Sequence, residues 1–174
     1  MIVASHLSKK YRKKLAVDDL SFEVEKGKVT GFLGPNGSGK STTMRLMLGL
    51  ANGSGITTFD GKKLTDYSNP ANVVGLLLEA KAFHPTRTAR NHLKILATAG
   101  NIPVSRVNEV LRIVGLETEA KSKPGKFSLG MSQRLGIAAA ILGKPKYLLL
   151  DEPANGLDPE GIAWLRQFLR DYAN

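Results

Sequence analysis

One eight-residue segment constrains this chain more than any other. Residues 34–41 read Gly-Pro-Asn-Gly-Ser-Gly-Lys-Ser, which fits the pattern Gly-x-x-x-x-Gly-Lys-Ser/Thr without a gap. The apolar run Val29–Leu33 precedes it, and a helix-forming stretch from Thr42 to Leu50 follows. A strand, a glycine-rich loop and a helix in this order form the context in which the pattern binds phosphate. The sequence therefore predicts a phosphate-binding loop, with a glycine-rich turn that fits by chance as the alternative.

The residue types in this segment suit a triphosphate. Glycines let the backbone turn tightly and leave amide N–H groups uncovered at the positive end of the following helix. Lys40 would then reach the β and γ phosphates, and Ser41 would offer its hydroxyl to Mg²⁺. We therefore expect a bound triphosphate together with a magnesium ion.

Two adjacent carboxylates follow a second apolar segment. Tyr147–Leu150 reads as a strand buried on both faces, and Asp151 and Glu152 come directly after it. Ligands of open parallel sheets bind at the carboxyl ends of the strands. Asp151 is thus a candidate Mg²⁺ ligand, and Glu152 is a candidate to orient or deprotonate a water. A plain polar strand cap is the alternative.

Composition narrows the class of protein. The chain has 174 residues, of which 42% are apolar, enough for one globular domain with a core. No stretch approaches a membrane span, and the N-terminal segment Met1–Lys14 has charge where a signal peptide would be apolar. We therefore expect a cytoplasmic protein. Cysteine is absent, which excludes disulfides and thiolate metal sites.

The charge balance favours anionic ligands. Lysine and arginine number 25 against 15 acidic residues, a formal charge of +10. The densest cluster, Lys9–Lys14, contains Tyr11. This cluster suits a nucleic-acid or lipid-surface contact, but a solvated turn beside an edge strand is the favoured interpretation.

The remaining patterns predict an α/β fold. Strands are expected at Ile2–Leu7, Ser21–Glu25, Ile56–Asp60 and Val73–Leu78. Helices are expected after Thr88, after Ser105 with Val107, Val110, Leu111 and Val114 on one face, and at Met131–Leu142 and Glu160–Tyr172. His6, His84 and His92 have no metal-ligand spacing, so we expect no metal site built on them.

With these elements placed, nearly the whole chain resembles the ATP-binding cassette (ABC) ATPases. The resemblance implies a P-loop NTPase (RecA-like) core with a parallel sheet, an N-terminal antiparallel β subdomain and a helical insert. It divides a single domain of residues 1–174 into a β subdomain with the phosphate loop (1–80), the insert (81–128) and a final part (129–174). That part would hold the signature helix, the second nucleotide motif and the last helix.

The resemblance also assigns nucleotide-binding residues. Tyr147–Asp151 matches the Walker B motif, with Glu152 in the position of the catalytic glutamate. Tyr11 stands where the family places an aromatic that stacks on adenine, although a half-buried edge-strand tyrosine is the alternative. The Walker A loop, with Lys40 acting in catalysis too, would bind ATP through Gly34, Pro35, Asn36, Gly37, Ser38, Gly39, Lys40, Ser41 and Thr42.

Three further segments resemble family motifs with changes. Phe127–Met131 keeps Ser128 and Gly130 of the signature Leu-Ser-Gly-Gly-Gln, and this altered form looks like that of drug and antibiotic exporters. An ordinary helix N-cap by Ser128 is the alternative. Leu157 and Asp158 match the D-loop. Glu79 stands at the Q-loop, where the family usually has glutamine; a plain surface acid is nearly as good an interpretation.

The family implies an ATPase that energises an exporter through a membrane permease. Two such domains would pair head to tail as a homodimer, and each would complete the other's ATP site through Ser128 and Gly130. The pair would lie at the inner face of the cell membrane. The family continues into a switch histidine, so we expect a C-terminally truncated chain with uncertain activity. The alternatives are a soluble nucleotide switch acting on ribosome or nucleic acid and an ATP-binding fragment without turnover. We expect no nucleic-acid partner.

Overall fold

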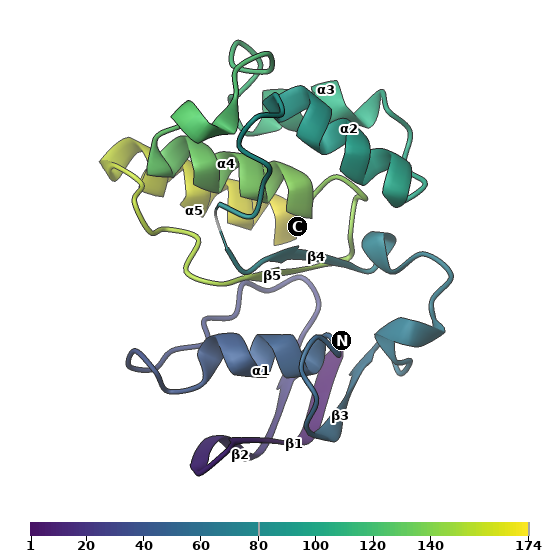
Figure 1. Ribbon diagram of the computed structural model, residues 1–174. Coiled ribbons are helices and arrows are strands. Elements are labelled where there is room, and N and C mark those ends of the chain that lie inside the picture. The colour runs from purple at the N-terminus through teal and green to yellow at the C-terminus, as the bar shows by residue number, and fades with distance from the viewer. Residues whose placement is uncertain (80, 174) are drawn as a thin grey trace. The chain divides into compact units, whose positions relative to one another are not determined.

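A computed structural model describes residues 1–79 and 81–173 of the chain. The chain forms two compact units, each with its own core (Figure 1). The N-terminal unit comprises residues 1–70 and the end of the chain from Phe168, and the helical unit comprises Ala71–Gln167. The expected division at residue 80, and the chain's last residue, lie outside the described residues.

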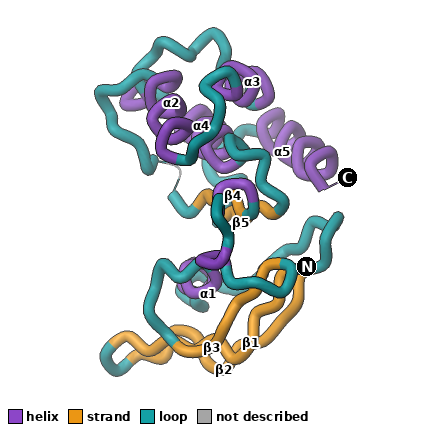
Figure 2. The backbone as a smooth tube through the Cα atoms, turned by 90° about the vertical axis from the view of Figure 1, so that its right-hand side faces the viewer, coloured by secondary structure: helices purple, strands orange, loops and turns teal. Residues whose placement is uncertain are grey.

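A three-stranded antiparallel sheet forms the base of the N-terminal unit. Its strands β1 (Ile2–Tyr11), β2 (Lys14–Val24) and β3 (Ser54–Phe59) lie in the order β2-β1-β3. Helix α1 (Lys40–Met47) packs on this sheet and buries Thr43, Leu46 and Met47 (Figure 2). The buried sheet residues are Ile2, Ala4, Leu7, Val17, Thr57 and Phe59. Short 3₁₀ turns follow at Leu64–Asp66 and Pro70–Asn72.

A two-stranded parallel sheet lies in the helical unit. Strand β4 (Val74–Leu77) pairs with β5 (Tyr147–Leu150), and Leu77 lies opposite Leu150. Helix α4 (Leu129–Ala140) packs on β4 (Figure 1). Gly75 permits this close approach, because a Cβ there would lie 2.1 Å from the carbonyl oxygen of Ala140.

Three more helices complete the chain. Helix α2 (Ala89–Ala99) begins after Thr88, whose hydroxyl accepts a hydrogen bond of 3.2 Å from the Asn91 amide. Helix α3 (Arg106–Ile113) places Val107, Val110 and Leu111 in the core, as their spacing predicted. Helix α5 (Pro159–Ala173) begins in the helical unit and ends among the residues of the N-terminal unit. A 3₁₀ turn at Pro124–Lys126 precedes α4.

The α/β class with a parallel and an antiparallel sheet is confirmed, but one predicted strand is wrong. Residues 28–35 adopt no regular structure, and the Leu33 side chain is 92% exposed. A strand requires a neighbour that accepts its backbone hydrogen bonds, and residues 28–35 take no part in the pairing of the described strands of the N-terminal unit. The apolar residues of this segment indicated a strand, but composition does not show whether a neighbouring strand is present to pair with it.

Two other expectations change in detail. Strand β5 is not buried on both faces, because Tyr147 and Leu149 are buried whereas Leu148 and Leu150 are only half-buried. The strand expected at Ile2–Leu7 continues as β1 to Tyr11 and pairs with Lys14 of the edge strand β2, so the basic cluster forms a hairpin turn beside an edge strand, in line with the favoured interpretation. None of the helices in the described part of the chain combines the length and apolar character that a membrane span requires.

Candidate nucleotide site

The predicted phosphate loop lies in the N-terminal unit and turns through two glycines in the left-handed region. Gly37 has a φ of +80° and Gly39 a φ of +95°, which glycine adopts without steric cost. A Cβ on Gly39 would lie 2.2 Å from the carbonyl oxygen of Ala16 on β2. Only glycine therefore lets the loop pass this close to the sheet before α1 begins.

The loop ends at the amino terminus of α1, which begins at Lys40. The first N–H groups of a helix have no intrahelical acceptor and carry the positive end of the helix dipole. The Thr43 amide and hydroxyl both donate to the carbonyl oxygen of Gly39, at 2.8 and 3.0 Å, which fixes the first turn. No acidic residue lies in that turn. This end of the helix is therefore suited to an anion.

The Lys40 side chain folds back across the loop. Its Nζ donates hydrogen bonds of 2.9 Å to the Gly34 carbonyl and 3.1 Å to the Pro35 carbonyl. The amide of Ser38 donates to the same Pro35 carbonyl at 3.2 Å. The Lys40 ammonium group thus lies at the loop. The two carbonyl groups carry no full charge, so these contacts neutralise the ammonium only partly.

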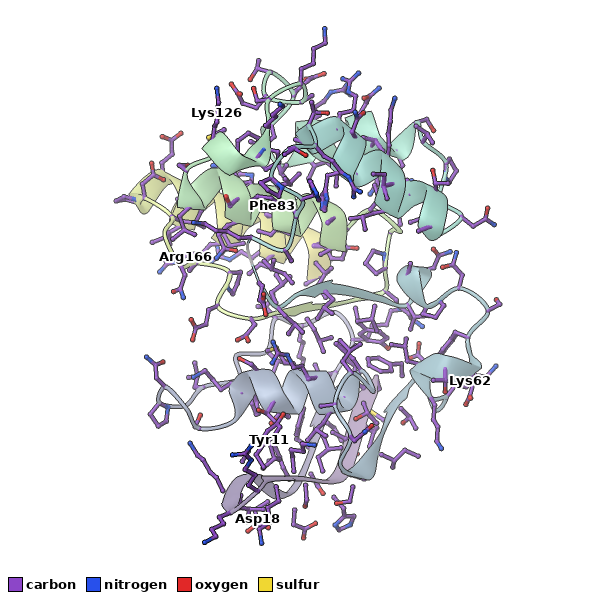
Figure 3. The ribbon with its side chains drawn as sticks, viewed as in Figure 1. Tyr11, Asp18, Lys62, Phe83, Lys126 and Arg166 are labelled. Carbon is purple, nitrogen blue, oxygen red and sulfur yellow. The ribbon has the colours of Figure 1, made fainter. Side chains whose placement is uncertain are left out.

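Tyr11 lies in the same unit, at the end of the β1–β2 hairpin (Figure 3). Its side chain is 47% exposed, which leaves part of the ring accessible to solvent. The Lys9 Nζ lies 4.7 Å from the centroid of the Tyr11 ring. The ring is therefore accessible and has a cation beside it.

The two carboxylates lie at the carboxyl end of β5 in the helical unit. The Asp151 amide donates a hydrogen bond of 2.7 Å to the Leu77 carbonyl, which continues the pairing with β4 by one residue. Glu152 has a φ of +47°, and its Oε2 accepts a hydrogen bond of 2.5 Å from the Asn155 side-chain amide. The chain therefore turns sharply at Glu152, and Asn155 holds that carboxylate.

Glu79 lies at the same edge of the parallel sheet. It follows the carboxyl end of β4, as Asp151 follows the carboxyl end of the neighbouring β5, and its side chain is exposed. Its carbonyl oxygen accepts a hydrogen bond of 3.3 Å from the Ala82 amide. The three acids that the sequence placed after strands thus all follow the carboxyl ends of the two paired strands.

The predicted signature and D-loop residues also lie together. A Cβ on Gly130 would lie 3.4 Å from both the Gly156 carbonyl oxygen and the Leu157 side chain. Ser128 caps α4, because its Oγ accepts a hydrogen bond of 3.1 Å from the Met131 amide. Asp158 accepts a hydrogen bond of 2.8 Å from the Gly161 amide at the start of α5. Both helix starts are therefore capped side by side.

Sequence analysis assigned no role to Gln133, which the structure places between these motifs. The side chain is 4% exposed, and its Nε2 donates to the carbonyl oxygens of Glu152 and Asn155, at 3.3 and 3.2 Å. A polar residue in an alanine-rich helix is a signal for such a contact in the sequence. Only the fold shows that it binds the turn after β5.

The described residues offer no protein-only metal centre. Among them, no group of three or more histidine or acidic side chains could hold a metal ion. The candidate residues form two sets, one in each unit. The phosphate loop and Tyr11 belong to the N-terminal unit. Glu79, Asp151, Glu152 and the signature and D-loop residues belong to the helical unit.

Comparison with known proteins agrees with these motifs. A family model described as "ABC transporter" matches residues 17–155. The bacitracin transport ATP-binding protein BcrA of Bacillus licheniformis is 42% identical over 99% of this chain and 58% of its own length. The lantibiotic transport ATP-binding protein SrtF of Streptococcus pyogenes is 36% identical over 99% of this chain and 75% of its own length. The chain thus spans little more than half of BcrA.

Solved structures show the same fold. The structure of an ATP-binding subunit of an ABC transporter matches with a TM-score of 0.85 and 28% identity, over 99% of this chain and 74% of that chain. A dimeric post-hydrolysis state of the ATP-binding cassette MJ0796, bound to ADP and Pi, matches with a TM-score of 0.85 and 25% identity. The match covers 97% of this chain and 81% of the MJ0796 chain.

Proposed function

Because this chain belongs to the ABC transporter family, we propose that it binds and hydrolyses ATP to energise an exporter through a membrane permease partner. The observation that carries this proposal is the loop of residues 34–41. Gly37 and Gly39 turn the loop in the left-handed region, Gly39 brings its backbone against β2, and a helix with no acid in its first turn begins at Lys40. This arrangement suits the phosphates of a nucleotide.

Residues 34–42 would bind the triphosphate through the loop amides. Lys40 would exchange its contacts with the Gly34 and Pro35 carbonyls for the β and γ phosphates. Hydrogen bonds between charged groups are shorter and about twice as strong as neutral ones, which favours this exchange. The base would stack on Tyr11, whose ring is accessible in the same unit.

Magnesium would be held by the Ser41 hydroxyl and the Asp151 carboxylate. Both are hard oxygen donors, and Mg²⁺ in nucleotide sites takes only one or two protein ligands beside phosphate oxygens and water. The ion would supply charge neutralisation on the β and γ phosphates.

Glu152 would orient the attacking water and accept its proton. Asn155 takes one of the two carboxylate oxygens, so that the group has a set direction. Glu79, at the same edge of the sheet, would approach the water or the magnesium ion from β4. Phosphoryl transfer depends mostly on such positioning and on electrostatic stabilisation by groups such as Lys40.

A second cassette, identical in a homodimer, would complete the site. Ser128 and Gly130 would contact the nucleotide bound by the partner cassette, and Leu157 and Asp158 would lie at the contact between the two. The side-by-side placement of these residues on α4 and before α5 supports a shared surface. The related cassette MJ0796 was solved as a dimer.

The cargo is proposed to be an antibiotic or related drug, because BcrA and SrtF are named for bacitracin and lantibiotic transport. The chain would act at the inner face of the cell membrane, attached to its permease. Residues 81–128 would form the insert that transmits motion, between the part with the phosphate loop (1–80) and the final part (129–174). These relatives favour transport over a ribosome or nucleic-acid switch. An ATP-binding piece without turnover is the remaining alternative.

A thermal-shift titration with MgATP tests the proposal. At 100 times the dissociation constant, ligand binding adds about 2.7 kcal/mol, which for a protein of this size raises Tm by about 5–10 °C. Lys40→Ala should remove this shift, whereas Lys13→Ala, the same change in the exposed hairpin turn, should retain it. An equal shift in wild type and Lys40→Ala would show that the loop is not the ATP site.

A further inference from the structure

Lys9 differs from the other lysines of the basic hairpin. Its side chain is half-buried, whereas Lys10 and Lys13 are exposed. Its Nζ donates a hydrogen bond to the backbone carbonyl of Asn52, in the segment that follows α1. The same Nζ lies 4.7 Å from the centroid of the Tyr11 ring. Lys9 is therefore anchored at one end and in contact with an aromatic ring.

The two side chains meet because of strand geometry. Residues two apart on a β-strand share a face, and Lys9 and Tyr11 are both on β1. A cation over an aromatic ring is attracted to the ring's negative face, and here it covers one face. With the Tyr11 side chain 47% exposed, the ring still offers surface to a flat ligand.

The phosphate loop approaches the same part of the sheet. A Cβ on Gly39 would lie 2.2 Å from the carbonyl oxygen of Ala16 and 3.4 Å from the Val17 side chain. Val17 pairs directly with Lys9 across the hairpin. Tyr11 lies two residues further along β1, about 7 Å at the usual rise of a strand. The end of the loop and the ring are thus separated by a distance that a nucleotide can span.

We propose that Lys9 is a positioning residue that fixes the Tyr11 ring as a platform for the base of the nucleotide. This inference rests on the proposed ATP binding and adds a residue to it. A ring already held in one orientation loses less side-chain freedom when a base stacks on it. The Asn52 carbonyl fixes the cation in turn, so that Lys9 acts on the base through Tyr11 and not through the phosphates.

Titration of the whole chain with two ligands tests this role. MgATP carries the base, and magnesium tripolyphosphate has similar charge without it. Lys9→Met should weaken ATP binding by about two- to five-fold, the fold-change expected from an exposed cation–π contact, and leave tripolyphosphate binding unchanged. Lys9→Arg should retain wild-type ATP binding, because a guanidinium also stacks on aromatic rings. Lys10→Met, an exposed neighbour, is the matched control for lost charge.

Double substitution gives a second readout. If Lys9 acts through the ring, then Lys9→Met should cause no further loss of ATP affinity in a Tyr11→Leu background. Equal weakening of ATP and tripolyphosphate by Lys9→Met would overturn the inference, because it would make Lys9 a phosphate contact. Unchanged ATP binding by Lys9→Met would overturn it too. In either case the proposed function stands as long as the wild-type chain binds MgATP. A wild-type chain that binds neither ligand would overturn both.

Discussion

The Gln133 side chain on α4 donates a hydrogen bond of 3.2 Å to the backbone carbonyl of Asn155. Its second hydrogen bond, of 3.3 Å, reaches the Glu152 carbonyl, so one buried amide holds both ends of the turn after β5. Asn155 in turn holds the Glu152 carboxylate. The helix that carries the signature residues is therefore bonded to the segment that carries the proposed catalytic acid.

Replacing this amide should loosen the turn. Gln133→Leu has a similar volume but removes both hydrogen bonds to the Glu152 and Asn155 carbonyls, so we expect the free energy of unfolding to fall by about 1–3 kcal/mol. Urea denaturation measures the change. Asn108→Leu, at an exposed position of α3, should shift it by less than about 0.5 kcal/mol. Equal effects of the two changes would mean that the Gln133 contacts contribute nothing specific.

The two loop glycines should respond differently to alanine. Gly39→Ala adds a Cβ that would lie 2.2 Å from the Ala16 carbonyl oxygen, whereas a Cβ on Gly37 meets nothing within 4 Å. Both residues have positive φ, which costs an L-residue about 1–2 kcal/mol. We therefore expect Gly37→Ala to lose only that amount and Gly39→Ala to lose more, with a weaker MgATP thermal shift. Matching losses in the two variants would contradict the contact with β2.

Glu152→Gln should separate binding from turnover. The amide is nearly the same size and can still accept the hydrogen bond from Asn155, but it cannot take a proton from water. We expect phosphate release to fall by about 10²–10⁴-fold while the MgATP thermal shift stays. Glu160→Gln, in the first turn of α5, is the control and should keep wild-type turnover. A loss of the thermal shift in Glu152→Gln would instead place Glu152 in nucleotide binding.

His92 should make stability depend on pH. Burial, and then the charge of Arg87, hold the pKa of His92 below its ordinary value of 6.5. As pH falls below 6.5, the unfolded chain takes up the proton before the folded chain does, so stability falls with pH. His92→Gln should therefore reduce the difference in urea midpoint between about pH 7.5 and about pH 5. Asn91→Gln, which adds no titrating group, should leave that difference as it is.

Local patterns in the sequence were sufficient for much of the molecule. The spacing of Val107, Val110 and Leu111 predicted the buried face of α3, and the four apolar residues from Tyr147 predicted β5. The glycine-rich motif predicted a loop followed by a helix, and α1 begins at its lysine. These predictions succeeded because periodicity, capping and glycine conformation depend on residues only a few positions apart.

Contacts between distant segments were decided by the fold. Residues 28–35 have apolar composition but no strand partner in their unit, and Gln133 is a hydrogen-bond donor to a turn about twenty residues away only because α4 packs beside it. The cation beside Tyr11 is likewise held by a carbonyl beyond α1. The sequence by itself determined which segments carry phosphate and carboxylate chemistry. Tertiary structure decided which side chains orient these segments. Backbone pairing and buried hydrogen bonds need partners from distant parts of the chain, and the order of residues does not specify those partners.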